Sequence, residues 1–135
     1  MRVVVDTNVF VSGAYWTGPP HEILLAWERG AFDLVVSPDI LTEYLRVLRE
    51  FDRGTEDLPK WEGLLSTRAY LVQLITEFEA IPEDPDDNKF LSAAFDAQAA
   101  VIVSGDKHLL TLGSFRGIRI LTPAAFLREL GGERR

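Results

Sequence analysis

Hydrophobic residues fall into two patterns along this chain, short continuous runs and longer runs with helical spacing. The short runs are rich in β-branched residues and lack period-two alternation, so they predict strands that are buried on both faces, as in a parallel sheet. The predicted strands are residues 3–5, 32–36, 99–104 and 118–121. Because segments with helical spacing separate these strands, the chain predicts an alternating α/β fold.

Two of the predicted helices have clear ends. The first covers residues 21–29 and closes on a glycine. The second begins with Ser37 as its cap, followed by a proline and an acid, and extends to about Phe51. Glu43 lies at the border of its apolar face, where its side chain can point toward a cleft, although a solvated glutamate is the commoner explanation of such a residue.

Residues 61–78 carry many large apolar side chains and predict one long or two short amphipathic helices. This apolar surplus makes the segment a candidate dimer face, with Leu74 as an outward member and ordinary core packing as the alternative. We expect a single domain over residues 1–130 and a flexible tail over residues 131–135. Shorter helices are predicted over residues 90–95, 107–110 and 124–130.

Composition narrows the class of protein. With 135 residues, 47% of them hydrophobic and 26% charged, the chain predicts one soluble domain that needs no disulfide or structural metal. There are no cysteines, no apolar run long enough to span a membrane and no signal-like segment, so we expect a cytoplasmic protein. The formal net charge of −7 argues against a surface that coats nucleic acid, but it leaves room for a local basic strip beside an acidic site.

Acidic residues follow two of the predicted strands. Asp6 comes directly after residues 3–5, and Asp106 comes shortly after residues 99–104. Ligands bind outside the carboxyl ends of strands in open α/β sheets, so both acids lie where a ligand site is expected. For Asp6 alone a structural role is equally well supported, because Asp-Thr-Asn also suits an Asx turn or a helix cap.

A third acid comes from the segment Asp84-Pro85-Asp86-Asp87, which precedes a helical run. Much of this acidity suits the first turn of a helix. Asp87, however, lies three, four and seven residues before apolar members of the helix, which places it on the buried face, where an unpaired carboxylate is costly. Helical phase therefore selects Asp87, with Asp84 and Asp86 as competing choices.

Together with Glu43 at the border of its helix, these acids indicate a metal site. Carboxylates held close together repel one another and have raised pKa values unless a cation is present. With oxygen ligands and no cysteine, Mg²⁺ or Mn²⁺ suits such a site better than zinc. The chemistry that such an ion favours is phosphodiester hydrolysis.

Four segments resemble, in order, the motifs of the PIN-domain ribonucleases, most closely the PIN toxins of bacterial and archaeal toxin–antitoxin systems. They are residues 3–8, Ser37-Pro38 with Glu43, residues 84–91 and residues 103–110. The resemblance implies a three-layer α/β/α fold with a parallel sheet of about five short strands, frequent homodimerisation and inhibition by a small antitoxin protein. It also implies a set of acids that hold Mg²⁺ or Mn²⁺ with two polar residues in support, namely Asp6, Glu43, Asp87 and Asp106 with Asn8 and Ser104.

An RNA substrate then needs positive side chains near the acids. The candidates for RNA contact are Arg46, Arg49, Arg53, Lys107 and His108, although each type is more often a solvated surface residue.

Two other functions compete with the ribonuclease. One is a non-catalytic PIN-like binding module, in which the acids hold a structural ion or only cap helices; metal-dependent RNA cleavage would distinguish the two. The other is an aspartyl-phosphate phosphotransferase with Asp6 as nucleophile. That chemistry commonly requires a second acid two residues later, where this chain has Asn8.

Overall fold

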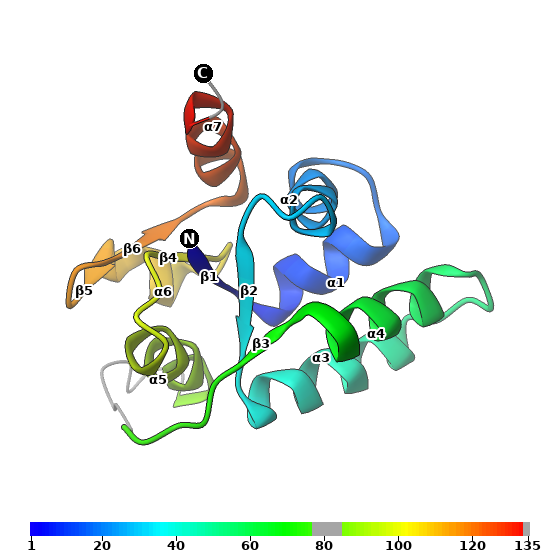
Figure 1. Cartoon of the computed structure of the whole chain (residues 1–135), viewed down its shortest axis with the longest axis horizontal. Helices are drawn as coiled ribbons and strands as arrows, with labels where there is room; N and C mark the ends of the chain where they lie inside the picture. Colours follow the sequence, from blue (N-terminus) through cyan, green and yellow to red (C-terminus); the bar gives the residue numbers. More distant parts are fainter. Residues whose placement is uncertain (77–84, 134–135) are drawn as a thin grey trace.

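A six-stranded sheet forms the centre of the molecule in the computed structural model, which describes residues 1–76 and 85–133 (Figure 1). The strands are β1 (Arg2–Val5), β2 (Asp33–Val36), β3 (Tyr70–Leu71), β4 (Val101–Val103), β5 (Ser114–Phe115) and β6 (Ile118–Leu121). Their order is β3-β2-β1-β4-β6-β5, and every neighbouring pair is parallel except β5 with β6. The predicted α/β class is confirmed; the sheet gains an antiparallel edge strand too short for sequence periodicity to reveal.

Helices cover the sheet on both sides. In chain order they are α1 (Thr7–Tyr15), α2 (Pro19–Glu28), α3 (Pro38–Glu50), α4 (Asp57–Arg68), the 3₁₀ turn η1 (Pro85–Asp87), α5 (Asn88–Asp96), α6 (Lys107–Leu112) and α7 (Pro123–Glu133). Figure 1 shows α1 to α4 gathered on one side of β1 and β2, with α5 on the other. Within residues 1–76 and 85–133, no helix is long and apolar enough to cross a membrane.

The chain reverses its direction across the sheet between β1 and β4. These two strands lie side by side, with Val5 opposite Val103. From β1 the chain continues to β2 on one side, whereas from β4 it continues to β6 on the other. In an open parallel sheet such a reversal leaves a crevice at the carboxyl ends of the two strands. Asp6 and residues 104–106 follow those ends directly.

Packed aromatic rings hold α1 to α4 together. Phe10 of α1 stacks on Tyr44 of α3 with ring centroids 4.4 Å apart. Phe10 also meets Trp27 of α2 and Trp61 of α4 edge-on, at 6.1 and 6.5 Å. All four rings are buried, and such pairs add to the stabilisation from burial alone. This cluster fixes α1 and α3, which both carry site residues, relative to each other.

The structure corrects the prediction of helix over residues 61–78. Helix α4 ends at Arg68, and residues 70–71 form the edge strand β3, which pairs with β2. Residues 72–76 are neither helix nor strand, and Phe78 lies outside the described residues. The extended backbone gains its hydrogen bonds from β2, a contact that local sequence cannot foresee.

The proposed dimer face changes with that correction. Trp61 and Leu65 belong to the chain's own core, and Leu74 packs against that core. Within residues 61–76, the large apolar side chains that stay exposed are those of Tyr70, at 39%, Leu71, at 60%, and Ile75, at 89%.

Helices α1 and α7 also differ from prediction. Helix α1 was not predicted, although its cap at Asp6 was recognised as an alternative role for that residue. The last helix continues to Glu133, so part of the predicted tail over residues 131–135 is helical; residues 134 and 135 lie outside the described range.

Candidate active site

Four acids lie around one pocket of about 170 Å³, and all were predicted as site residues. They come from four places in the fold: the end of β1, the middle of α3, the start of α5 and the loop after β4. The residues are Asp6, Glu43, Asp87 and Asp106, with Asn8 and Arg46 also lining the pocket. The pocket lies at the crevice that the reversal between β1 and β4 creates.

Asp6 is both a helix cap and a pocket residue. Its Oδ1 atom accepts a hydrogen bond from the Val9 N–H at 2.8 Å, which caps α1. Its Oδ2 atom accepts from the Ser104 hydroxyl and, at 3.3 Å, from the Gly105 N–H. Burial raises the pKa of Asp6 against the effect of these hydrogen bonds, and the charge of Asp106 raises it further. The capping and ligand-binding interpretations are therefore compatible.

Ser104 connects the two aspartates that follow the strands. Its side chain is fully buried, its hydroxyl donates to Asp6, and its Oγ atom accepts from the Asp106 N–H at 2.9 Å. Asp106 in turn caps α6, because its Oδ1 atom accepts from the His108 N–H at 2.7 Å. This arrangement is the one expected of a polar support residue.

Helix α3 brings Glu43 to the pocket through its neighbour Tyr44. The buried Tyr44 hydroxyl donates to the carbonyl oxygen of Val5, which anchors α3 to the end of β1; burial raises the pKa of this phenol well above its ordinary value. One oxygen of Glu43 accepts from the Thr7 hydroxyl and the other from Lys89 Nζ at 2.8 Å. Burial by itself would raise the pKa of Glu43, but Lys89 and Thr7 outweigh it and hold the pKa below its usual range.

Asp87 is the pocket acid of the third segment. It precedes α5 directly, is 7% exposed and lines the pocket, so the burial expected from helical phase is confirmed. Asp86 is exposed, and Asp84 lies outside the described residues.

Sequence reasoning did not single out Thr7 and Lys89, the two residues that hold Glu43. One signal for Lys89 was available, since a positive residue in the first turn of a helix opposes the helix dipole and needs another explanation. For Thr7 there was no such signal.

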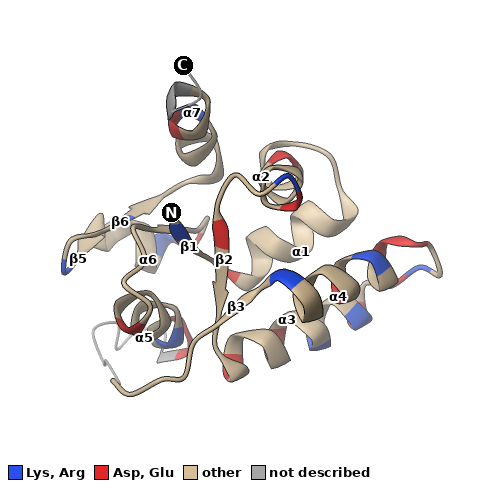
Figure 2. Cartoon of the chain, in the orientation of Figure 1, with Lys and Arg blue, Asp and Glu red and all other residues tan. Residues whose placement is uncertain are grey.

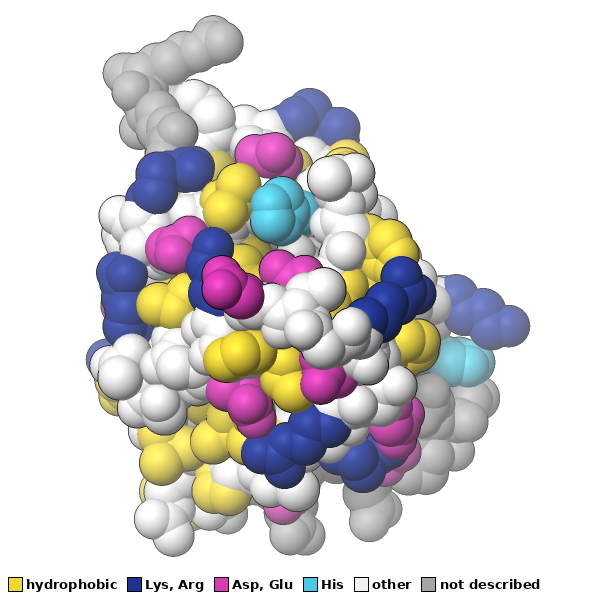
Figure 3. Space-filling model, turned by 90° about the vertical axis from the view of Figure 1, so that its right-hand side faces the viewer, with side chains coloured by type: hydrophobic (Ala, Val, Ile, Leu, Met, Phe, Trp, Pro, Cys, Tyr) yellow, Lys and Arg dark blue, Asp and Glu magenta, His cyan; other side chains and the backbone are white. Residues whose placement is uncertain are grey.

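The predicted RNA-contact residues are spread more widely than the acids, and only one of the five lines the pocket. Arg46 lines the pocket, whereas Arg49 and Arg53 lie farther along or beyond α3, and all three are exposed. Lys107 and His108 begin α6 and are absent from the lining of the acidic pocket. Acidic and basic residues are interspersed over α3 and α4 in Figure 2, and both kinds alternate over the face that Figure 3 shows.

The donor set suits a hard divalent cation. Carboxylate oxygens are the ligands that Mg²⁺ and Mn²⁺ prefer, and the raised pKa of Asp6 reflects a buried charge that a cation would compensate. Among the residues described here, no three acidic or histidine side chains lie close enough together to hold a metal ion. Asp6, Glu43 and Asp106 instead accept hydrogen bonds from the chain's own donors. A cation at this pocket would share the carboxylate oxygens with these donors or compete with them.

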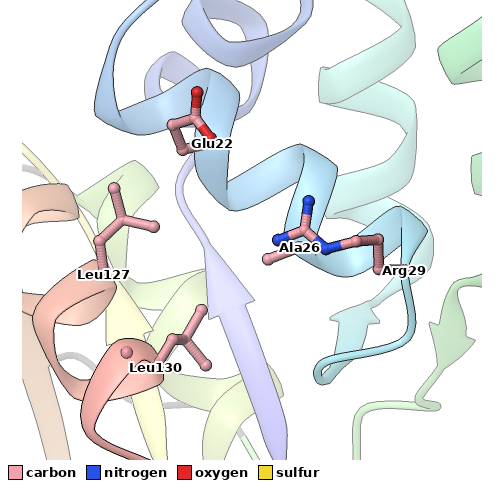
Figure 4. A pocket seen from close by; sticks show the side chains of 6 residues that line it. Glu22, Ala26, Arg29, Leu127 and Leu130 are labelled. Carbon is pink, nitrogen blue, oxygen red and sulfur yellow. The ribbon is translucent and has the colours of Figure 1, made fainter. Parts of the chain in front are cut away.

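Of two other hollows in the described structure, only one contains acids of the pocket. A groove of about 460 Å³ shares Asp6, Asn8 and Asp106 with the pocket and continues past Ser12 and Pro20. A separate pocket of about 250 Å³ between α2 and α7 is lined mainly by apolar side chains together with one acid and one base (Figure 4). It contains none of the predicted site residues.

The fold and the pocket define an α/β protein with an acidic site at the carboxyl edge of a parallel sheet. The sequence profile of the PIN domain matches residues 2–108. The chain belongs to the PIN domain family.

Two known proteins extend this comparison. An uncharacterized protein of Methanocaldococcus jannaschii is 29% identical, over 96% of this chain and 91% of its own length. The crystal structure of VapBC2 from Rickettsia felis, bound to a DNA fragment from their promoter, matches with a TM-score of 0.63 and 12% identity over 90% of this chain and 98% of that chain. At that identity the second likeness concerns the fold.

Proposed function

We propose that this PIN-domain protein is a metal-dependent endoribonuclease. The observation that carries the proposal is the meeting of Asp6, Glu43, Asp87 and Asp106 in one pocket at the reversal point of the sheet. Helix caps have no need to meet at a common point, and the charge of Asp106 beside the buried carboxylate of Asp6 is costly without a cation. Membership of the PIN family supports nuclease chemistry.

In this proposal the aspartates hold Mg²⁺ or Mn²⁺. When bound, the ion supplies positive charge to the phosphate oxygens and lowers the pKa of water. Asp6, Asp87 and Asp106 would hold it, while Ser104 keeps the carboxylate of Asp6 oriented from behind. Asn8 is exposed at the pocket and can hydrogen-bond to a phosphate oxygen of the substrate.

Single-stranded RNA is the proposed substrate. The groove that shares Asp6 and Asp106 with the pocket gives an extended strand a path to the acids. Arg46 borders the pocket, and it is the first candidate for a phosphate contact. Farther contacts are assigned to Arg49, Arg53, Lys107 and His108.

We further propose that the chain is the toxin of a toxin–antitoxin pair and forms homodimers. The likeness in fold to VapBC2 of Rickettsia felis supports a protein partner. A small protein encoded beside this chain should copurify with it and inhibit its cleavage of RNA.

A non-catalytic binding module is the second candidate, and one observation favours it. Asp6, Glu43 and Asp106 accept hydrogen bonds from the chain's own donors, and among the described residues no three acidic or histidine side chains are close enough together to hold a metal ion. The phosphotransferase is less well supported, because this chain has Asn8 two residues after Asp6, where that chemistry commonly requires a second acid.

The experiment is incubation of the purified chain with end-labelled single-stranded RNA, with Mn²⁺ and with EDTA. Cleavage in Mn²⁺ that EDTA abolishes is the expected result. RNA binding without cleavage in either condition would support the binding module instead.

A further inference from the structure

Lys89 forms an ion pair with Glu43, one of the acids that line the pocket. Its Nζ atom lies 2.8 Å from Oε2 of Glu43 and 3.1 Å from the carbonyl oxygen of Asp86. The side chains of Lys89 and Glu43 are 16% and 21% exposed, whereas those of Arg46 and Glu50, a pair on the surface of α3, are 61% and 56% exposed. The Lys89–Glu43 pair therefore joins α5 to α3 at a place where solvent screens charges weakly.

Glu43 differs from the strand-end acids in what holds it. The hydrogen bonds to Asp6 and Asp106 come from the Ser104 hydroxyl and from backbone N–H groups, which are neutral donors. Glu43 receives a hydroxyl on one oxygen and a full positive charge on the other. Its negative charge is thus already compensated within the chain.

We propose that Lys89 is a built-in cation that competes with the divalent ion for Glu43. The divalent ion then binds on the side of Asp6, Asp87 and Asp106. This inference rests on the proposed function, because it takes the pocket to bind Mg²⁺ or Mn²⁺. A divalent ion on Glu43 would face the Lys89 ammonium at close range, and like charges repel most strongly where water is excluded. Lys89 is a positioning residue that lowers the pocket's affinity for divalent ions.

The test is a calorimetric titration of the full chain with MnCl₂. Lys89→Met removes the ammonium and frees Glu43, so we expect the dissociation constant for Mn²⁺ to fall by about tenfold or more. Lys89→Arg keeps the charge and should bind Mn²⁺ as the wild type does. Lys60→Met is the matched control, because Lys60 pairs with Glu28 on the exposed surface of α4 and α2. That variant should leave the affinity unchanged.

A double variant isolates the competition. In Glu43→Gln/Lys89→Met the freed carboxylate is absent, so the gain in Mn²⁺ affinity should disappear. If the Lys89–Glu43 pair only joined α3 to α5, Lys89→Met would give a different result. Loss of the pair would loosen the pocket and would not lower the dissociation constant for Mn²⁺. Lys89→Gln provides the same comparison if Lys89→Met does not fold, with circular dichroism as the check of folding.

The outcomes separate the two proposals. If the wild type binds Mn²⁺ and folded Lys89→Met or Lys89→Gln binds it no more tightly, the role of Lys89 is overturned and the metal site stands. If neither the wild type nor the Lys89 variants bind Mn²⁺, the proposed metal site itself is overturned, and the inference with it.

Discussion

At the scale of single residues, Asp6 shows how one side chain can serve fold and site together. It caps α1 through one oxygen and presents its carboxylate to the pocket, and burial raises its pKa from the ordinary value of 3.8. The unfolded chain therefore releases this proton at lower pH than the folded chain. Protonation of Asp6 therefore favours the folded state. Its contribution to the free energy of unfolding is fully present below the pKa of the unfolded chain, and it is lost as the pH rises through the pKa of the folded chain.

The first prediction follows from this sign. Asparagine keeps an acceptor for the cap but has no charge, so in EDTA the wild type should lose stability relative to Asp6→Asn as the pH rises from about 4 toward about 7. Thermal melts of both proteins across that interval measure the difference. A difference that does not change with pH contradicts a strained, buried carboxylate at this position.

A second prediction concerns the metal. Mn²⁺ at ten times its dissociation constant should stabilise the wild type by about 1.4 kcal/mol by mass action. Asp6→Asn loses a proposed ligand, so it should lose most of the corresponding rise in melting temperature. Equal stabilisation of both proteins would remove Asp6 from the metal site.

Single residues also mark what sequence could reveal about the site. Asp6 and Asp106 were found because they follow apolar runs, and Asp87 because its phase on the helix faces the core. The contact between Glu43 and Lys89 joins residues 46 positions apart through the approach of α3 to α5. No local pattern carries that information, so the partner of Glu43 had to come from the structure.

At the scale of elements, the packing of α1 on α2 gives a third prediction. A Cβ atom on Gly13 would lie 2.6 Å from the carbonyl oxygen of Pro20 and 2.8 Å from Cγ of Leu24. Because backbone must move to admit it, Gly13→Ala should destabilise the chain by about 1–3 kcal/mol in urea unfolding.

Gly63 provides the matched control for that variant. It lies in α4, and a Cβ there would meet nothing within 4 Å. Gly63→Ala should therefore be neutral or stabilise the chain by up to about 1 kcal/mol through helix propensity. Equal effects of the two substitutions would mean that α1 and α2 do not approach as closely as described.

Elements also differ in how far sequence predicts them. Helix α3 was predicted nearly to its ends, because a serine cap and a proline mark its start. Residues 69–76 were predicted as helix, since this stretch contains no glycine or proline and its apolar residues continue the helical spacing. Pairing of β3 with β2 decided their conformation, and this is a tertiary contact that overrides local preference.

At the scale of the whole molecule, the fourth prediction concerns assembly. Within the described residues, β3 pairs with β2 alone and forms one edge of the sheet, and Leu71 and Ile75 expose apolar surface there. An edge strand has unpaired backbone N–H and C=O groups, and exposed apolar surface beside it favours contact with another chain. We therefore expect a dimer through this region. Ile75→Lys should then sediment as a folded monomer. A wild type that stays monomeric at high concentration contradicts the dimer.

The most direct test of the account compares two neighbouring aspartates in one cleavage assay. Asp87 is buried in the pocket, whereas Asp86 is exposed and outside it. With Mn²⁺ and single-stranded RNA, Asp87→Asn should lose nearly all cleavage, and Asp86→Asn should keep it, provided that both variants fold. Loss of cleavage in Asp86→Asn together with full activity in Asp87→Asn would contradict the site assigned to this chain.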